Sequence, residues 1–401
     1  MSSASSTPDD RVAEDHPNFS LVAGGPLFQL LRRARLTDDA LGMMHRRIAV
    51  FVLLTWLPPL ILAFAGRQAL DGNLAVPFLR DVNFQVRFLV AVPLLFIGEL
   101  LAHLRVRPMV EMFLERRLIP ESAVTEFNAA VASAIRLRNS VFAEVLMIGV
   151  VYIFGTLIWW RLYQTLDAPT WYATPSREGT ALSLAGFWYA FVSLPVFQFL
   201  LIRWYFRVFV WARFLWRVSH IKLVLVPTHP DRMGGLGFLS SAMFAPVAAA
   251  HGALLAGLLA NRIYYFGAKL PDFKFEVAVM VIFVLCLALG PLLAFSLKLA
   301  RAKRIGNREY GTLAERYVRV FDAKWLRGGA NSDEPLIGSA DIQSLADLSN
   351  SFEVVRSMRP VPVTTESFIV LAAATLAPIV ALILTMMPLE DFLKALSGIR
   401  S

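Results

Sequence analysis

Cysteine is almost absent from this chain. Its 401 residues include a single cysteine, Cys286, so no intramolecular disulfide can form and no cysteine-rich metal site can be built. The His-Glu-x-x-His pattern of zinc enzymes, the Gly-x-Ser-x-Gly elbow of serine hydrolases and the paired aspartates of lipid phosphotransferases are also missing from the sequence. We therefore expect no cofactor and no metal ion.

Charge is scarce as well: 17% of the residues are charged and 57% are hydrophobic. The apolar residues gather in seven runs of about 20 residues, the length of a helix that crosses the ~30 Å hydrocarbon core of a bilayer. We predict an all-α polytopic membrane protein with about seven transmembrane helices, at residues 48–65, 88–104, 140–162, 182–202, 237–260, 277–297 and 368–387. Six of these spans contain proline, which predicts kinked helices.

The distribution of Lys and Arg predicts the orientation of these spans. The loops at 1–47, 105–139, 203–236 and 298–367 hold 29 of the 39 basic residues, and the alternate loops hold the other ten. Basic loops stay on the cytoplasmic side, so we expect a cytoplasmic N-terminus and a C-terminus outside. The +9 net charge then faces the anionic inner leaflet, and no nucleic-acid partner is needed to explain it. Arginine outnumbers lysine, as in many bacteria, and we expect the bacterial inner membrane.

Segments outside the spans have patterns of their own. Residues 1–25 predict a disordered cytoplasmic tail, and an amphipathic stretch on the inner leaflet follows from Pro26. The membrane domain of spans one to six covers residues 26–297, and residues 388–401 form a short outer tail. Residues 298–367 predict two amphipathic helices in a cytoplasmic hairpin, whose 306–358 part could dock a second copy or another protein. We expect no strands.

Three ionisable residues lie inside the predicted spans: Glu99, Glu144 and His251. A charge at the centre of a membrane helix costs about 2.5–3.5 kcal/mol, so such residues usually face the bundle and often serve a pathway. If Glu99 and Glu144 converge, they form a proton or cation site. Alternatively, they extend to the inner interface or pair with Arg105, Arg107 or Arg138. His251 is either a proton relay or a hydrogen-bonded structural histidine.

The most distinctive local sequence is the loop at 228–241, before the fifth predicted span. Gly234 and Gly235 predict a tight turn whose free N–H groups could bind an anion, assisted by Arg232. His229 and Asp231 could supply acid–base chemistry. The loop lacks the end of a Walker phosphate loop, and a simple Pro-Asp turn with glycine packing explains the same residues.

This loop, together with the segment Gly338-Ser339-Ala340-Asp341-Ile342 and its continuation to Leu348, resembles a family of uncharacterised bacterial multi-pass membrane proteins. The resemblance covers mainly the second half of the chain. It implies a polytopic helical fold and no particular activity.

Four arginines precede the loop on one side of a helix: Arg203, Arg207, Arg213 and Arg217. The fourth span and this run together exceed the length of one crossing. We expect a separate helix on the inner leaflet whose arginines contact anionic lipid headgroups, and a specific lipid or phosphate ligand is the alternative.

These patterns support three functional hypotheses. The first is transport or permeation of a small solute, ion or proton along Glu99, Glu144 and His251. The second is a non-catalytic scaffold or sensor subunit that docks partners through residues 306–358. The third, ranked last, is a membrane-embedded enzyme that acts on a lipid or phosphorylated substrate at the 228–241 loop.

Overall fold

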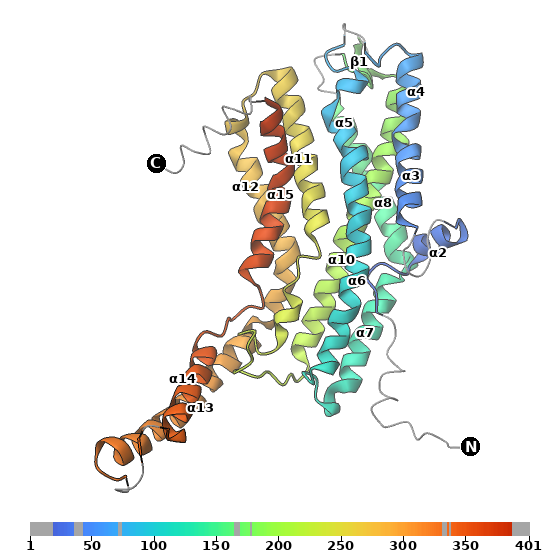
Figure 1. Ribbon diagram of the computed structural model, residues 1–401. Coiled ribbons are helices and arrows are strands. Elements are labelled where there is room, and N and C mark those ends of the chain that lie inside the picture. The colour runs from blue at the N-terminus through green and yellow to red at the C-terminus, as the bar shows by residue number, and fades with distance from the viewer. Residues whose placement is uncertain are drawn as a thin grey trace, which may run out of the picture.

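The computed structural model describes residues 19–35, 43–70, 74–163, 169–176, 179–330, 335–336 and 338–386. It is 77% helical with almost no strand, which confirms the all-α fold class. The helices form an elongated bundle, and a helical hairpin projects from one end of it (Figure 1). We call this the hairpin end, and we call the opposite end, which carries a small β-hairpin, the strand end.

Fourteen helices follow one another within the described ranges. In chain order they are α2 (Pro26–Arg33), α3 (Met44–Thr55), α4 (Leu57–Ala65), α5 (Val82–Val86), α6 (Val92–Glu115), α7 (Val124–Arg138), α8 (Val141–Tyr163), α9 (Leu184–Trp188), α10 (Leu194–His220), α11 (Ala245–Phe266), α12 (Lys274–Leu289), α13 (Ser296–Phe321), α14 (Ala340–Arg356) and α15 (Thr365–Met386).

Five helical segments in the described part are long and apolar enough to cross a membrane: Met44–Ala65, Val82–Glu115, Leu184–His220, Leu270–Leu326 and Thr365–Leu382. The protein is therefore a membrane-embedded helical protein, and the predicted count of seven spans is not confirmed. The third and fifth predicted spans correspond to α8 and α11, which fall outside these five. The fifth was also predicted to begin too early: residues 236–239 form a short 3-10 helix, and α11 begins at Ala245.

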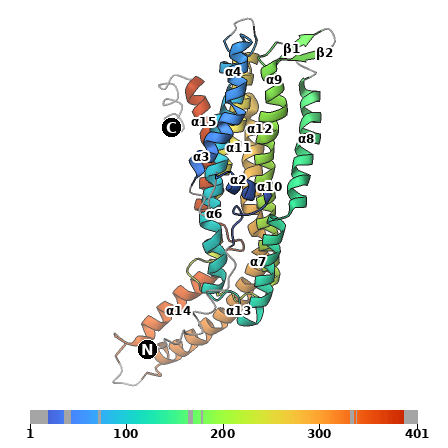
Figure 2. The same cartoon turned by 90° about the vertical axis from the view of Figure 1, so that its right-hand side faces the viewer.

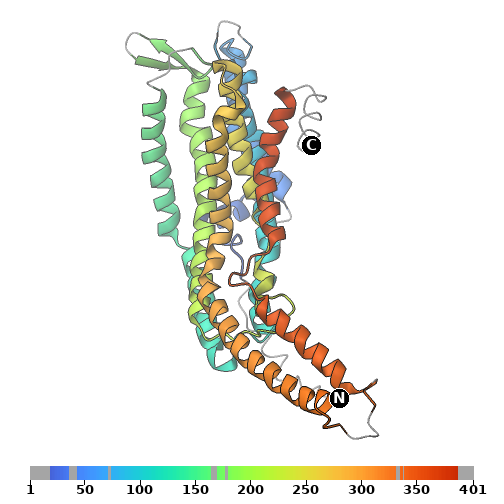
Figure 3. The ribbon, with the colours of Figure 1, turned by 90° about the vertical axis from the view of Figure 1, so that its left-hand side faces the viewer.

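Helix α11 is largely covered by other helices. It packs most closely against α15 and also contacts α5, α6 and α12. A Cβ atom on Gly252 would lie 1.9 Å from the carbonyl oxygen of Thr375 on α15, so only glycine fits at this crossing. Small residues let the backbones approach, and they contribute little hydropathy. In Figures 1 and 3, α11, α12 and α15 form one group of helices, beside the group that contains α5 and α6.

Proline shapes the long helices as the sequence predicts. A π-helical segment, Arg87–Ala91, precedes Pro93 in the second span, and another, Tyr189–Ser193, precedes Pro195 in the fourth. Proline has no N–H to donate, so one backbone hydrogen bond of the helix is lost. The wider π-helical turn gives neighbouring backbone groups other hydrogen-bond partners. The guanidinium of Arg87 donates to the hydroxyl of Tyr189, so the two irregular segments contact each other.

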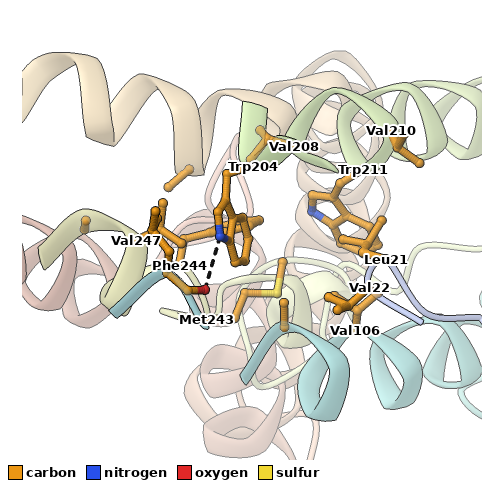
Figure 4. Packing of buried hydrophobic residues seen from close by; sticks show 14 of the residues in the cluster. Leu21, Val22, Val106, Trp204, Val208, Val210, Trp211, Met243, Phe244 and Val247 are labelled. Atoms are coloured by element: carbon orange, nitrogen blue, oxygen red, sulfur yellow. Dashed lines mark hydrogen bonds between the residues drawn. The ribbon is translucent and has the colours of Figure 1, made fainter. Parts of the chain in front are cut away.

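The N-terminal tail is shorter than predicted. Phe19, Leu21 and Val22 are at most 3% exposed, whereas the sequence suggested disorder through residue 25. Figure 4 shows Leu21 and Val22 beside Val106 of α6 and Trp211 of α10. These apolar residues are too few to signal a core segment by themselves, and the helices of the bundle provide the surface that buries them. Residues 1–18 and 387–401, with most of both predicted tails, lie outside the described residues.

Two short strands at the strand end were not predicted. β1 (Ala173–Ser176) and β2 (Gly179–Leu182) pair antiparallel in the loop between α8 and α9. Buried Asp81 ties this loop to the bundle, because its carboxylate accepts hydrogen bonds from Trp171 Nε1 at 2.9 Å and from Asn261 of α11 at 2.8 Å. The strands are only four residues long, too short for an alternating pattern to appear.

In the range of the expected hairpin, α13 continues directly from α12 through a 3-10 segment, Gly290–Phe295, and α14 packs back against it (Figures 2 and 3). Asp341 at the start of α14 accepts hydrogen bonds from Lys324 and Trp325, and these bonds lower the pKa of its carboxyl. The hydroxyl of Tyr317 adds a bond to the Asp341 carbonyl at 3.1 Å.

The α11–α15 crossing yields a direct test. Gly252→Ala places a methyl group against the α15 backbone and should destabilise the protein by at least about 1–3 kcal/mol through overpacking. The measurement is thermal unfolding of the purified protein in detergent. Gly149→Ala on α8 is the matched control, because nothing lies within 4 Å of the added carbon and alanine favours the helix. Equal melting temperatures for the two variants would contradict this packing.

Candidate functional site

The interior of the bundle holds a cluster of charged side chains from four helices. Every member is at most 7% exposed: Arg47 of α3, Glu99 of α6, Glu144 of α8, and Arg203 and Arg207 of α10. Arg203 and Arg207 are four residues apart, so they lie on one face of α10, and this face is turned toward the interior. We call these five residues the buried charge cluster.

Glu99 is at the centre of the cluster. One oxygen of its carboxylate lies 2.8 Å from Nη1 of Arg47, and the other lies 2.7 Å from Nη1 of Arg207. The guanidinium groups also lie over aromatic rings, Arg47 over Phe96 at 5.3 Å and Arg207 over Trp204 at 5.1 Å. Two guanidinium cations thus pair with a single carboxylate. Neither is one of the partners suggested by the sequence, Arg105, Arg107 and Arg138.

Several guanidinium donors in the cluster remain unused. Nε and Nη2 of Arg47 and Nη2 of Arg207 are buried and have no hydrogen-bond partner. Among the described residues, no hydrogen bond or ion pair reaches the Arg203 side chain, although it lies in the field of both Glu99 and Glu144. Buried donors without partners are rare in native structures, because leaving one unpaired costs about 1–3 kcal/mol. The cluster therefore holds more positive charge and more donors than its own acceptors satisfy.

A small cavity adjoins Arg203 and Arg207. Its lining includes Gly24, Arg138, Glu144, Arg203 and Arg207, and it has room for about one water molecule. The cavity is lined by the N-terminal segment, the last residue of α7, α8 and α10, so a ligand there would contact four parts of the chain.

Glu144 has a different partner from Glu99. Its carboxylate accepts a hydrogen bond of 2.9 Å from the backbone N–H of Leu27, in the first turn of α2. A carboxylate at a helix N-terminus is favoured by the helix dipole and by the free N–H groups there. Glu99 and Glu144 thus have separate partners: Glu99 is held by arginines, Glu144 caps α2, and Arg203 lies in the field of both.

His251 belongs to a separate hydrogen-bonded group. Its Nδ1 lies 2.7 Å from the carbonyl oxygen of Val247, so this nitrogen carries the proton, and Nε2 accepts from the hydroxyl of Tyr205 at 2.9 Å. The ring of Phe283 lies 5.9 Å away. Both ring nitrogens are satisfied, and no contact in the described ranges joins His251 to either glutamate. The hydrogen bond between Tyr205 and His251 connects α10 to α11.

The four arginines of α10 do not act as a group. The helix continues without interruption to His220, so there is no separate helix on the membrane surface. Arg203 and Arg207 are buried, Arg213 is exposed and Arg217 is half-buried. The prediction that all four contact lipid headgroups is wrong for the first two, which are buried. Glu99 of α6 pairs with Arg207, whose guanidinium lies over Trp204 of α10 itself.

The backbone of the glycine-rich loop donates hydrogen bonds to a carboxylate of the same loop, that of Asp231. Asp231 accepts hydrogen bonds from the N–H groups of Met233 at 2.8 Å, Gly235 at 3.2 Å and Gly237 at 2.8 Å. The chain turns through positive φ at Arg232, Gly234 and Gly235 to aim these donors inward. The predicted anion site is therefore filled by Asp231, and the N–H groups expected to bind a ligand are already used.

The surroundings of Asp231 lower the pKa of its carboxyl. Partial burial works to raise the pKa of its carboxyl, but the three backbone N–H groups and His229, whose Nδ1 lies 2.9 Å away, together hold the pKa below its ordinary value. Asp231 is thus an acceptor fixed in its ionised form, a poor candidate for a general base. Its hydrogen bonds fix the shape of the loop.

Sequence reasoning missed Arg47. It lies one residue before the first predicted span, where a basic residue ordinarily faces the headgroups, and its burial depends on Glu99, 52 residues away. In the described part of the chain, no three His, Cys, Asp or Glu side chains gather as a metal site requires.

No protein-family model, curated protein or solved structure matches this chain. The resemblance of the 228–241 loop to a family of bacterial membrane proteins therefore stays a prediction, and functional inference rests on the geometry of the site.

The ion pairs of the charge cluster predict that Glu99→Gln strongly reduces the stability of the fold. Removing this carboxylate leaves Arg47 and Arg207 buried without their counter-ion, which should cost about 3–5 kcal/mol of folding free energy. Adding Arg207→Gln should recover part of this loss, because one uncompensated charge disappears. The measurement is thermal or urea unfolding in detergent. Glu111→Gln is the control: this exposed partner of Arg107 on the same helix should cost about 0–1 kcal/mol.

Asp231→Asn tests the loop. Asparagine retains one acceptor oxygen, but its NH2 group then faces a backbone N–H that has no acceptor. We expect the folding free energy to fall by about 1–3 kcal/mol. The lowered pKa gives the pH dependence: the stabilisation is complete above the carboxyl's unfolded-state pKa and disappears as pH falls through the folded-state value. Acidification should therefore reduce the stability of the wild type more than that of the variant. Parallel pH profiles would contradict this assignment.

Proposed function

We propose that the protein is an integral multi-pass protein of the bacterial inner membrane, with a cytoplasmic N-terminus, that binds a small anion at the buried charge cluster and transports it. The observation that carries this proposal is the excess of buried arginine over carboxylate, with guanidinium donors that lack partners beside a cavity. An unpaired charge inside a membrane protein is costly, and such residues usually mark an ion pathway. The excess charge here is positive, so the ligand that compensates it is negative.

The chemistry of the site narrows the ligand class. Arg47, Arg203 and Arg207 exceed Glu99 by two positive charges, and Arg138 and Glu144 at the cavity offset each other. One or two negative charges would balance the site, and guanidinium groups bind oxyanions through paired N–H donors. The cavity has room for about one water molecule, so a single-atom anion such as chloride fits it as it stands, whereas nitrate or phosphate requires the lining to move.

The helices that carry the cluster also contain points of flexure. The π-helical segments before Pro93 and Pro195 lie in the helices that hold Glu99, Arg203 and Arg207. Interrupted helices near a binding site are common in transporters, where they allow one part of the bundle to move against another. These segments support movement of a bound anion rather than its permanent storage.

A scaffold or sensor role is the second candidate. The α13–α14 hairpin projects away from the bundle and exposes apolar side chains, including Leu313 at 50%, Val320 at 64% and Leu326 at 73%. Isolated exposed apolar residues are common, but a row of them on a projecting hairpin suits a protein partner or a second copy of the chain. The enzyme hypothesis has less support, because Asp231 is already used within its own loop.

Arg203→Gln tests anion transport. The purified protein is reconstituted in liposomes, and flux of chloride, nitrate and phosphate is measured, together with stabilisation of the detergent-solubilised protein by each anion. Loss of a charged hydrogen bond worth about 1.5–3 kcal/mol should weaken anion binding by roughly tenfold or more. Arg203 is chosen because it has no ion pair with Glu99, so the pair with Arg47 and Arg207 survives.

Arg213→Gln is the matched control, since Arg213 is an exposed arginine on the same helix and should leave flux and binding unchanged. A wild-type protein that neither transports nor is stabilised by any of the three anions would overturn the proposal. Equal losses in both variants would also overturn it, because the effect would then follow from surface charge.

A further inference from the structure

A second site lies between α6 and α15, and its lining includes no member of the buried charge cluster. A groove of about 560 Å³ runs between α6, the loop at 238–243 and the first turns of α15. Leu101, Met109 and Val370 form an apolar wall of this groove, and Arg105, Ser241 and Glu366 contribute polar groups to it. None of these residues belongs to the buried charge cluster, and none is a hydrogen-bond partner of Asp231.

The two charges in the groove are opposite and unpaired. Arg105 and Glu366 are exposed, and neither forms a hydrogen bond or an ion pair with another residue in the described ranges. They come from helices more than 250 positions apart in sequence, so the fold, rather than a local pattern, places them in one groove. A guanidinium and a carboxylate that share a groove without contact can bind a ligand that carries both charges.

Both charges also lie at a defined depth. The second predicted span ends at residue 104 and the seventh begins at residue 368, so Arg105 and Glu366 lie just beyond the apolar segments. Lipid headgroups occupy this level, while Leu101 and Val370 extend toward the hydrocarbon. This placement rests on the proposed topology, in which the hairpin end of the bundle is cytoplasmic.

We propose that the groove binds a phospholipid of the cytoplasmic leaflet whose headgroup joins a phosphate to a primary ammonium, the phosphatidylethanolamine class. The Arg105 guanidinium binds the phosphate through charge-assisted hydrogen bonds, and the Glu366 carboxylate binds the ammonium. An acyl chain lies along Leu101 and Val370, which are on the hydrocarbon side of the two charges. The carboxylate gives selectivity, since it attracts an ammonium and repels a headgroup that carries only negative charge.

The test uses the full-length protein in detergent with added lipids of identical acyl chains and three headgroups: ethanolamine, choline and glycerol. Native mass spectrometry counts bound lipid, and thermal unfolding measures the stabilisation. The wild type should bind the ethanolamine lipid roughly tenfold more tightly than the glycerol lipid, a difference of about 1.4 kcal/mol. Equal binding of all three lipids would overturn the proposal.

Two variants separate the roles of the charges. Arg105→Gln should weaken binding of every phospholipid, because the phosphate contact is lost. Glu366→Gln should abolish the preference for ethanolamine and strengthen binding of the anionic glycerol lipid. Both side chains are exposed and unpaired, so neither change should disturb folding. An unchanged order of preference in Glu366→Gln would overturn the assignment.

Arg107→Gln is the matched control, because Arg107 is exposed on the same helix but pairs with Glu111 and does not line the groove. Soluble phosphoethanolamine distinguishes a membrane lipid from a free metabolite: binding as tight as that of the intact lipid would overturn the lipid assignment. Anion flux in Arg105→Gln should match the wild type, so failure of this proposal and failure of the transport proposal can be told apart.

Discussion

The ion pairs of Glu99 with Arg47 and Arg207 hold the centre of the bundle together. Each carboxylate oxygen takes one guanidinium, and the three side chains come from α3, α6 and α10. Removing these charges from water is costly, and close contact recovers that cost only if all partners are present. The pairs therefore fix how α3 and α10 are placed against α6, and with them the cavity, the N-terminal segment and the position of α8.

The same constraint explains the unusual chemistry of the interior. A third arginine, Arg203, lies one turn from Arg207 and has no carboxylate of its own within the described chain. A protein built only for stability would gain from replacing such a group with an apolar one of similar volume. Its presence beside unsatisfied donors of Arg47 and Arg207 is what favours an anion as the missing partner.

Two sites, at different depths, share helix α6. Glu99 lies in the buried cluster, and Arg105, less than two turns further along, lines the groove next to α15. Because α6 is one continuous helix from Val92 to Glu115, it contributes residues to both sites.

The sequence by itself determined the helical class, the membrane environment, the kinks at proline and the use of Glu99 and Glu144 as interior groups. Each follows from local properties: run length, the missing N–H of proline, and the cost of a charge in hydrocarbon. Only the tertiary structure decided which charges meet. Arg47 and Glu99 are 52 residues apart, and residues 19–22 are buried by helices that follow much later. The 228–241 loop shows the same division, since its glycines signalled a tight turn, but only folding placed Asp231 where a ligand was expected.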